Sequence, residues 1–303
     1  MNRLKMVDIN KSFLIKQVLK NINCELTDGV YGLLGENGAG KTTLFRCIVN
    51  YYSFSGKILL NDKPLDKKMM KKIGYLPQNF TSFPELTVKE TLEYFCCLKE
   101  ISKAEVNAQI DECLRYTNLA DVSKKKIKTL SGGMLRRVGI AQAILGHPEL
   151  IILDEPTSGL DPEERVRLNN VIQKISDGRI ILFSTHIVED VEASADKVII
   201  MKDGSVMYQG PTKDVRNEAE GKILEVDKEE IEKIPDAYIF KSYYRGNQKV
   251  YRALLTNKAN IESDMSISDN IDQKEDKNDI FDSDNLVKNT TVEDGYICLC
   301  HEK

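Results

Sequence analysis

The stretch GENGAGKTT, from Gly35 to Thr43, decides the fold of this chain. It fits the phosphate-binding pattern G-x-x-x-x-G-K-[ST]. Residues 29–34 before it, GVYGLL, are short and apolar and predict a buried strand, whereas residues 42–49 after it have the apolar spacing of a helix. A strand, a glycine-rich turn and a helix are the context that this pattern requires, so a chance glycine turn is disfavoured.

The composition of the loop indicates how it binds phosphate. Its glycines let successive backbone N–H groups point inward as a nest for anions, at a helix N-terminus whose dipole favours negative charge. We expect Lys41 to reach the β- and γ-phosphates and the Thr42 hydroxyl to bind Mg²⁺. The residues expected to bind the nucleotide here are Gly35, Asn37, Gly38, Ala39, Gly40, Lys41, Thr42 and Thr43.

The overall composition is that of an ordinary soluble protein. A chain of 303 residues predicts about two domains. The net charge of −4 lacks the basic field of a nucleic-acid binder, so we expect no nucleic-acid partner. Seven scattered cysteines do not form a disulfide framework. With no apolar run of about 20 residues and no secretory start, we expect a cytosolic chain that is soluble by itself.

The first part of the chain predicts an α/β nucleotide-binding domain over residues 1–215. Residues 4–26 alternate as edge-type strands, 53–65 as a hairpin, and 73–78 as a short strand that ends at Pro77. Strand signals then vanish, and a helical subdomain is expected at about 86–135. It begins with the capping-box pattern of Thr87 and Glu90, and a second helix is predicted over 103–118.

A second anion site is predicted at Ser131, Gly132 and Gly133, which precede a helix expected over 135–145. A chain with one nucleotide has no evident use for two phosphate cradles. The second cradle therefore favours a dimer, in which it caps a nucleotide held by a partner chain. The alternative is a glycine-containing helix cap without function.

Two carboxylates end the buried strand predicted over residues 150–155. Ligands of open α/β sheets gather at the carboxyl ends of strands. We therefore expect Asp154 to hold Mg²⁺ and Glu155 to orient or deprotonate the attacking water. The nearby Asp161 has a sufficient structural explanation as the cap of a helix that begins with Pro162.

Three further residues have both a functional and a structural interpretation. His186 ends another buried strand, and its position favours a hydrogen bond to the γ-phosphate over a purely structural role. Gln78 is either a solvated loop residue or a hinge whose amide reaches the metal or the water. Phe13, expected in the loop between the first two strands, either packs at the sheet edge or stacks on adenine.

The remainder, residues 216–303, predicts a small α+β accessory domain. Strands are expected at 222–226 and 249–255 with acidic helical material between them, and a last amphipathic helix over 292–300. Residues 263–284 are rich in Asp, Asn, Ser and Lys, and we expect this acidic segment to be partly flexible. Cys298, Cys300 and His301 are too close together for an ordinary zinc site.

Taken in order, these motifs resemble the nucleotide-binding subunit of ATP-binding cassette (ABC) transporters over about residues 1–215. GENGAGKTT resembles the Walker A loop, LSGGM the family signature, LIILDEP the Walker B strand, and SGLD the D-loop. Gln78 lies where the family has its Q-loop glutamine, His186 where it has its switch histidine, and Phe13 where it has its adenine-stacking aromatic. The signature usually ends in Gln, and here Met134 replaces it.

The resemblance implies a P-loop ABC fold: a mixed sheet core, an N-terminal antiparallel subdomain and a helical subdomain. It implies that Glu155, His186 and Gln78 are catalytic and that Thr42, Gln78 and Asp154 bind Mg²⁺. It also implies a homodimer with each ATP between Walker A of one copy and Ser131–Gly133 of the other. A separate polytopic permease would hold the dimer at the inner face of the membrane, contacting it near residues 79–87.

The C-terminal part resembles that of bacterial exporter ATPases of the drug- and peptide-resistance kind. Two other hypotheses compete with a transport ATPase. One is a soluble, non-transport cassette that acts in translation, DNA repair or iron–sulfur assembly, which the single cassette and the acidic extension disfavour. The other is a sensor in which the C-terminal part binds a regulator.

Overall fold

The computed structural model describes residues 1–234, 237–255, 286–287 and 289–301. The chain divides into two compact units, Met1–Thr212 and Lys213–Lys303. The predicted acidic segment at residues 263–284 lies outside the described residues. Within the ranges that the structure describes, no helix has the length and apolar character needed to cross a membrane.

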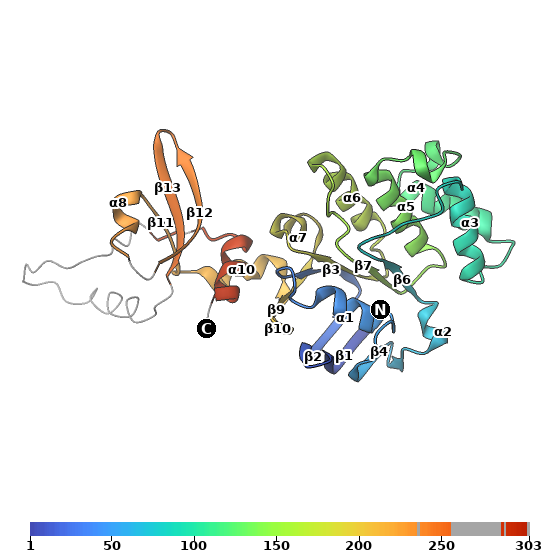
Figure 1. Cartoon of the computed structure of the whole chain (residues 1–303), viewed down its shortest axis with the longest axis horizontal. Helices are drawn as coiled ribbons and strands as arrows, with labels where there is room; N and C mark the ends of the chain where they lie inside the picture. The colour runs from blue at the N-terminus through green and yellow to red at the C-terminus, as the bar shows by residue number, and fades with distance from the viewer. Residues whose placement is uncertain (235–236, 256–285, 288, 302–303) are drawn as a thin grey trace, which may run out of the picture. The chain divides into compact units, whose positions relative to one another are not determined.

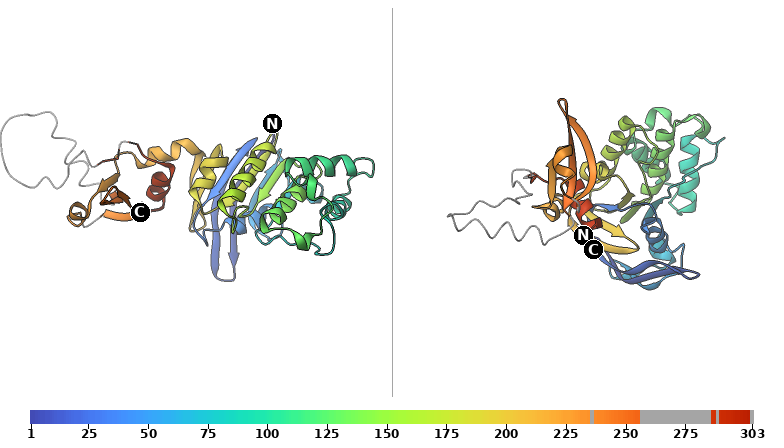
Figure 2. Two further views of the ribbon diagram at one scale, coloured as in Figure 1. Left: turned by 90° about the horizontal axis from the view of Figure 1, so that it is seen from above. Right: turned by 60° about the vertical axis from the view of Figure 1, so that its left-hand side comes forward.

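The first unit begins with an antiparallel sheet in the order β2-β1-β4-β5. Its strands are β1 (Arg3–Phe13), β2 (Lys16–Thr27), β4 (Ser55–Leu60) and β5 (Lys63–Pro64). Phe13 is the last residue of β1, paired with Lys16, rather than a loop residue as predicted. The β1–β2 hairpin (blue) projects as a long ribbon in both views of Figure 2, and its turn residues Leu14 and Ile15 are fully exposed.

A six-stranded mixed sheet, in the order β10-β9-β3-β8-β7-β6, forms the centre of this unit. Five strands are parallel and β10 is antiparallel to β9. The strands are β3 (Gly29–Leu34), β6 (Ile73–Leu76), β7 (Leu150–Leu153), β8 (Ile180–Thr185), β9 (Lys197–Lys202) and β10 (Ser205–Pro211). Because β3, β7 and β8 are parallel neighbours, their carboxyl ends meet at one edge, where a ligand is expected.

The two faces of this sheet are buried against different layers. On one face, Leu33, Ile152 and Leu182 pack with α1 and the antiparallel sheet, whereas on the other Ile151 and Phe183 pack with the helical layer (Figure 1). Burial of both faces explains why these strands are almost continuously apolar. The helices of the unit are α1 (Lys41–Ile48), α2 (Lys67–Met70), α3 (Val88–Leu98), α4 (Val106–Tyr116), η1 (Ala120–Val122), η2 (Ile127–Thr129), α5 (Gly132–Ile144), α6 (Pro162–Lys174) and α7 (Val188–Ser194).

Helix boundaries follow their capping residues. The capping box of Thr87 and Glu90 is present at the start of α3, and Asp161 caps α6, as the sequence predicts. Helix α5 begins at Gly132, three residues before its predicted start, because the Ser131 side chain accepts a hydrogen bond from the Met134 N–H. Glycine has a low helix propensity, so the sequence alone predicts that Gly132 and Gly133 lie before the helix.

The second unit is an antiparallel sheet in the order β11-β13-β12 with short helices. Its elements are η3 (Thr212–Ala219, which starts at the last residue of the first unit), β11 (Ile223–Val226), α8 (Lys228–Ile231), β12 (Ala237–Arg245), β13 (Gln248–Leu255) and α10 (Val292–His301). Strand β12 was not predicted: it is an edge strand with many exposed side chains, so its alternation is weak. The expected last helix is present as α10.

Candidate functional site

The phosphate loop connects β3 to α1, and two of its glycines adopt left-handed backbone conformations. Gly38 has φ +91° and Gly40, the N-cap of α1, has φ +106°. A Cβ at Gly38 would point into open space, with no atom within 4 Å, whereas a Cβ at Gly35 would lie 2.4 Å from the Met201 carbonyl oxygen. These positions therefore require glycine for conformation or for close packing.

Lys41 reaches back over the loop that precedes it. Its side chain is 6% exposed, and Nζ donates to the carbonyl oxygens of Gly35 at 2.5 Å and Glu36 at 3.1 Å. Burial lowers the pKa of this amine, and the neighbouring Glu155 and Asp154 oppose that shift. The Nζ atom also lies 3.8 Å from Glu155 Oε1, so the loop lysine and the Walker B end are in contact range.

Asp154 follows β7 and is fully buried beside the loop. Its Oδ1 accepts hydrogen bonds from Thr42 Oγ1 at 3.1 Å and Ser184 Oγ at 2.7 Å. Its Oδ2 is buried and has no partner among the described residues. A buried carboxylate oxygen without a donor is unfavourable. The free oxygen and the Thr42 hydroxyl are hard oxygen donors, so this pair fits a magnesium ion.

Glu155 lies next in the chain with a strained backbone. Its φ is +49°, in the left-handed region that is uncommon for residues other than glycine. Its N–H donates to Ser184 Oγ at 2.8 Å. Its side chain is almost fully buried, and Oε2 lies 3.1 Å from Nδ1 of His186, which follows β8. The edge where β3, β7 and β8 end thus brings Lys41, Glu155 and His186 together.

Among the described residues, the predicted site residues outside the phosphate loop and the ends of β7 and β8 form no hydrogen bond or ion pair with Lys41, Glu155 or His186. Phe13 is 39% exposed and packs edge-on against Tyr52, with ring centroids 5.0 Å apart. The Gln78 side chain is exposed. Ser131 caps α5, and a Cβ at Gly132 would meet nothing within 4 Å. Within the described residues of this chain, no hydrogen bond or ion pair joins 131–133 to 35–43.

Two residues of the site escaped the sequence analysis. Ser184 forms hydrogen bonds with both Asp154 and Glu155. The sequence pattern of this strand indicates only His186, at its end, as a functional residue. Arg136, in α5, donates to backbone carbonyls of the loops that carry Gln78 and Glu155. A serine inside a strand and an arginine inside a helix have no sequence pattern that marks them.

Comparison with known proteins assigns the family. The ABC transporter family model matches residues 19–158. An uncharacterized ABC transporter ATP-binding protein of Bacillus subtilis (strain 168), YxlF, is 34% identical over 233 residues, which are 76% of this chain and 78% of YxlF. The chain belongs to the ABC transporter ATP-binding proteins.

Another relative and a solved structure agree with this assignment. The linearmycin resistance ATP-binding protein LnrL of the same B. subtilis strain is 34% identical over 218 residues, 70% of each chain. The structure of cbiO1 from Clostridium perfringens, part of the ABC transporter complex cbiONQ, superposes with a TM-score of 0.64 at 30% identity, covering 69% of this chain and 88% of cbiO1.

Membership confirms the predicted cassette fold and the predicted activity. The protein is an ATPase with an ATP-binding cassette, and its mixed sheet, N-terminal antiparallel sheet and helical layer are those of the family. ABC ATP-binding subunits work with membrane permease components.

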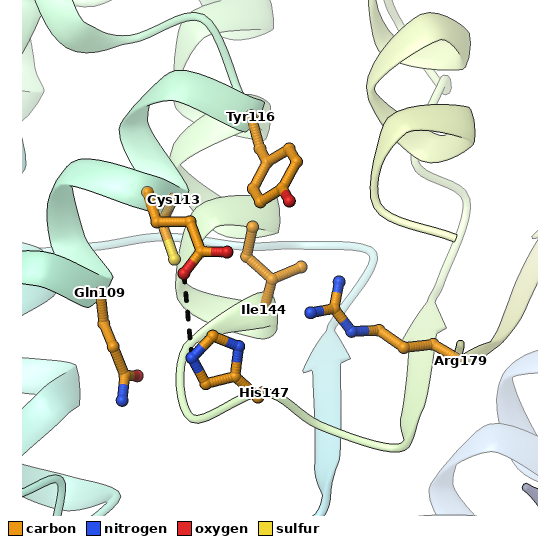
Figure 3. Close-up of a pocket in the computed structure, with 7 residues that line it drawn as sticks. Gln109, Cys113, Tyr116, Ile144, His147 and Arg179 are labelled. Carbon is orange, nitrogen blue, oxygen red and sulfur yellow. Dashed lines mark ion pairs between the residues drawn. The ribbon is translucent and has the colours of Figure 1, made fainter. Parts of the chain in front are cut away.

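A small pocket of the cassette lies away from these residues (Figure 3). It is lined by Gln109, Glu112, Cys113, Tyr116, Ile144, His147 and Arg179. Glu112 and His147 form an ion pair at 3.8 Å, and Gln109 accepts a hydrogen bond from the Gly146 N–H. These polar groups connect α4 to the turn after α5, which gives them a structural role.

Proposed function

We propose that this chain is the ATP-hydrolysing subunit of an exporter, in which two copies close on ATP and act on a separate polytopic permease. The observation that carries the proposal is the single cluster of the loop lysine, a buried carboxylate oxygen without a donor, and a strained glutamate beside a histidine. The resistance-type relative LnrL supports export. The permease would hold the chain at the cytoplasmic face of the membrane and contact it near residues 79–87.

The chemistry of the proposed reaction is the attack of water on the γ-phosphate. Lys41 and the loop N–H groups bind and orient the phosphates, with Asn37, Ala39 and Thr43 in the same loop. Thr42 and Asp154, together with Gln78, would hold Mg²⁺, and the ion would supply neutralisation of the phosphate charge. Glu155 accepts the proton of the attacking water. His186 lies within hydrogen-bond distance of Glu155, orients the Glu155 carboxylate and contacts the γ-phosphate.

The partner copy completes the site in this proposal. Ser131, Gly132 and Gly133 at the start of α5 cap the ATP that the other copy binds, because helix N-termini favour anions. Phe13 stacks on adenine, an arrangement that its partly exposed ring allows. Residues 1–215 act as the nucleotide-binding domain, residues 216–303 as an accessory domain, and nucleic acid is not a partner.

The test of the catalytic assignment is Glu155→Gln in the purified full chain. Loss of the general base should lower turnover about 10²–10⁴-fold while an ATP-bound dimer accumulates. Glu163→Gln, the same change at an exposed carboxylate of α6, is the control and should keep wild-type turnover. Unimpaired hydrolysis in Glu155→Gln would remove Glu155 from the role of base.

Two further measurements test the binding site and the partner. Lys41→Ala should abolish micromolar ATP affinity, and retained affinity would contradict the loop assignment. Affinity purification from mild detergent should recover a polytopic membrane protein with the chain. Recovery of ribosomes, DNA or iron–sulfur assembly proteins instead would favour the non-transport alternative.

A further inference from the structure

Arg136 holds four backbone carbonyl groups with one side chain. Its Nη1 donates to the carbonyl oxygens of Pro77 at 3.3 Å and Gln78 at 2.6 Å. Its Nη2 donates to Glu155 at 2.8 Å, and its Nε donates to Pro156 at 3.2 Å. All four acceptors belong to the two loops that carry Gln78 and Glu155. Only the planar guanidinium, with five donors in a fixed fork, has the shape to satisfy them together.

The position of Arg136 in the chain links these loops to a third functional element. It lies in α5, five residues after Ser131, which caps the same helix. The side chain is partly buried, and burial lowers the pKa of its guanidinium while Asp154 and Glu155 oppose the shift. Removing a guanidinium from water costs free energy unless its N–H groups find hydrogen-bond acceptors. Here the acceptors are carbonyl oxygens rather than a carboxylate.

The bond to Glu155 matters most because that residue is strained. A left-handed backbone conformation is strained for a residue other than glycine and persists only where the surroundings fix it. At Glu155, Ser184 accepts from the N–H and Arg136 donates to the carbonyl, so both neighbouring peptides are held. Without Arg136, the carbonyl oxygen of Glu155 loses its side-chain donor, and one of the two side-chain hydrogen bonds that hold the Glu155 backbone is lost.

We propose that Arg136 is a positioning residue for ATP hydrolysis: it fixes the loops of Gln78 and Glu155 to the helix that begins at the signature serine. This rests on the proposed role of Glu155 as the base. A displacement of α5 therefore moves both loops together, because Arg136 is hydrogen-bonded to their backbone carbonyls. Arg136 itself needs no contact with the nucleotide for this effect.

Arg137 provides a matched control in the next position of the same helix. It is 5% exposed and carries the same charge. Its guanidinium donates to the carbonyl oxygens of Thr117 and Asn118 and lies 3.6 Å from Glu164, so it touches neither loop. Its loss should destabilise the packing of the helical layer without moving Gln78 or Glu155.

The experiment compares Arg136→Met, Arg136→Lys and Arg137→Gln in the full chain by kcat, ATP affinity and Tm. Arg136→Met should lower kcat about 10–100-fold, as expected for a misplaced catalytic group, while ATP affinity is kept. Arg136→Lys keeps a single ammonium donor group, so its kcat should lie between those of the wild type and Arg136→Met. This variant also keeps the test valid if Arg136→Met does not fold. Arg137→Gln should lower Tm but keep kcat. Equal losses of kcat in the Arg136 and Arg137 variants, or none in the Arg136 variants, would overturn the proposal.

A double-mutant cycle with Glu155→Gln separates this inference from the proposed function. If Arg136 acts through Glu155, Arg136→Lys should reduce the residual rate of Glu155→Gln far less than it reduces the wild-type rate. Additive losses would refute the positioning role. Full activity in Glu155→Gln alone would instead refute the catalytic assignment of Glu155.

Discussion

Replacement of Ser184 by alanine tests the hydrogen-bond network beneath the site. Ser184 is fully buried in β8, and its hydroxyl joins the two residues at the end of β7. It donates to Asp154 Oδ1 at 2.7 Å and accepts from the Glu155 N–H at 2.8 Å. Ser184→Ala removes one bond to a carboxylate and leaves a buried N–H of a strained residue without an acceptor.

The magnitude follows from these two bonds. A hydrogen bond to a charged group contributes about 1.5–3 kcal/mol, and an unsatisfied buried donor costs about 1–3 kcal/mol. Allowing for non-additivity, we expect the free energy of unfolding to fall by about 3 kcal/mol, which lowers Tm by about 6–12 °C in a unit of this size. Turnover should fall as well, since Glu155 loses one of its two backbone anchors. Circular dichroism and phosphate release measure the two effects.

Ser194→Ala is the matched control for this prediction. Ser194 is 1% exposed, and its hydroxyl has no hydrogen-bond partner within the described residues. Removing an unpaired buried hydroxyl should leave stability unchanged or raise it. A loss of stability in Ser184→Ala no larger than that in Ser194→Ala would show that the hydroxyl network contributes nothing and refute the reasoning.

The remaining predictions concern the packing and capping of α5. Gly74→Ala places a Cβ 2.1 Å from the Ala143 carbonyl oxygen and should cost about 1–3 kcal/mol in chemical unfolding; a neutral result would contradict the close packing of β6 on α5. Lys99 donates to the carbonyl oxygens of Ala143 and Leu145, and burial lowers its pKa to about 8 from 10.5. The unfolded chain therefore binds more protons between pH 8 and 10.5, so the stability of the wild type relative to Lys99→Met should rise across this window; a constant difference would exclude the shift.

The sequence by itself determined the features that depend on residues a few positions apart. The phosphate loop, the capping box at Thr87, the cap at Asp161 and the apolar strands are all local patterns, and the structure has each of them. The positions of the strand ends could also be predicted from the sequence, because each apolar run stops where polar side chains begin. The parallel arrangement of those ends then predicted that the loop, Asp154, Glu155 and His186 converge.

Only the tertiary structure decided which side chains support that cluster. The bonds of Ser184 to Asp154 and of Arg136 to Gln78 and Glu155 join segments 19 to 58 residues apart in sequence. Such contacts depend on strand order and on the seating of α5 over β6, which no local pattern encodes. For the same reason the edge strand β12 was missed, since an edge strand takes its stability from the neighbouring strand rather than from its own alternation.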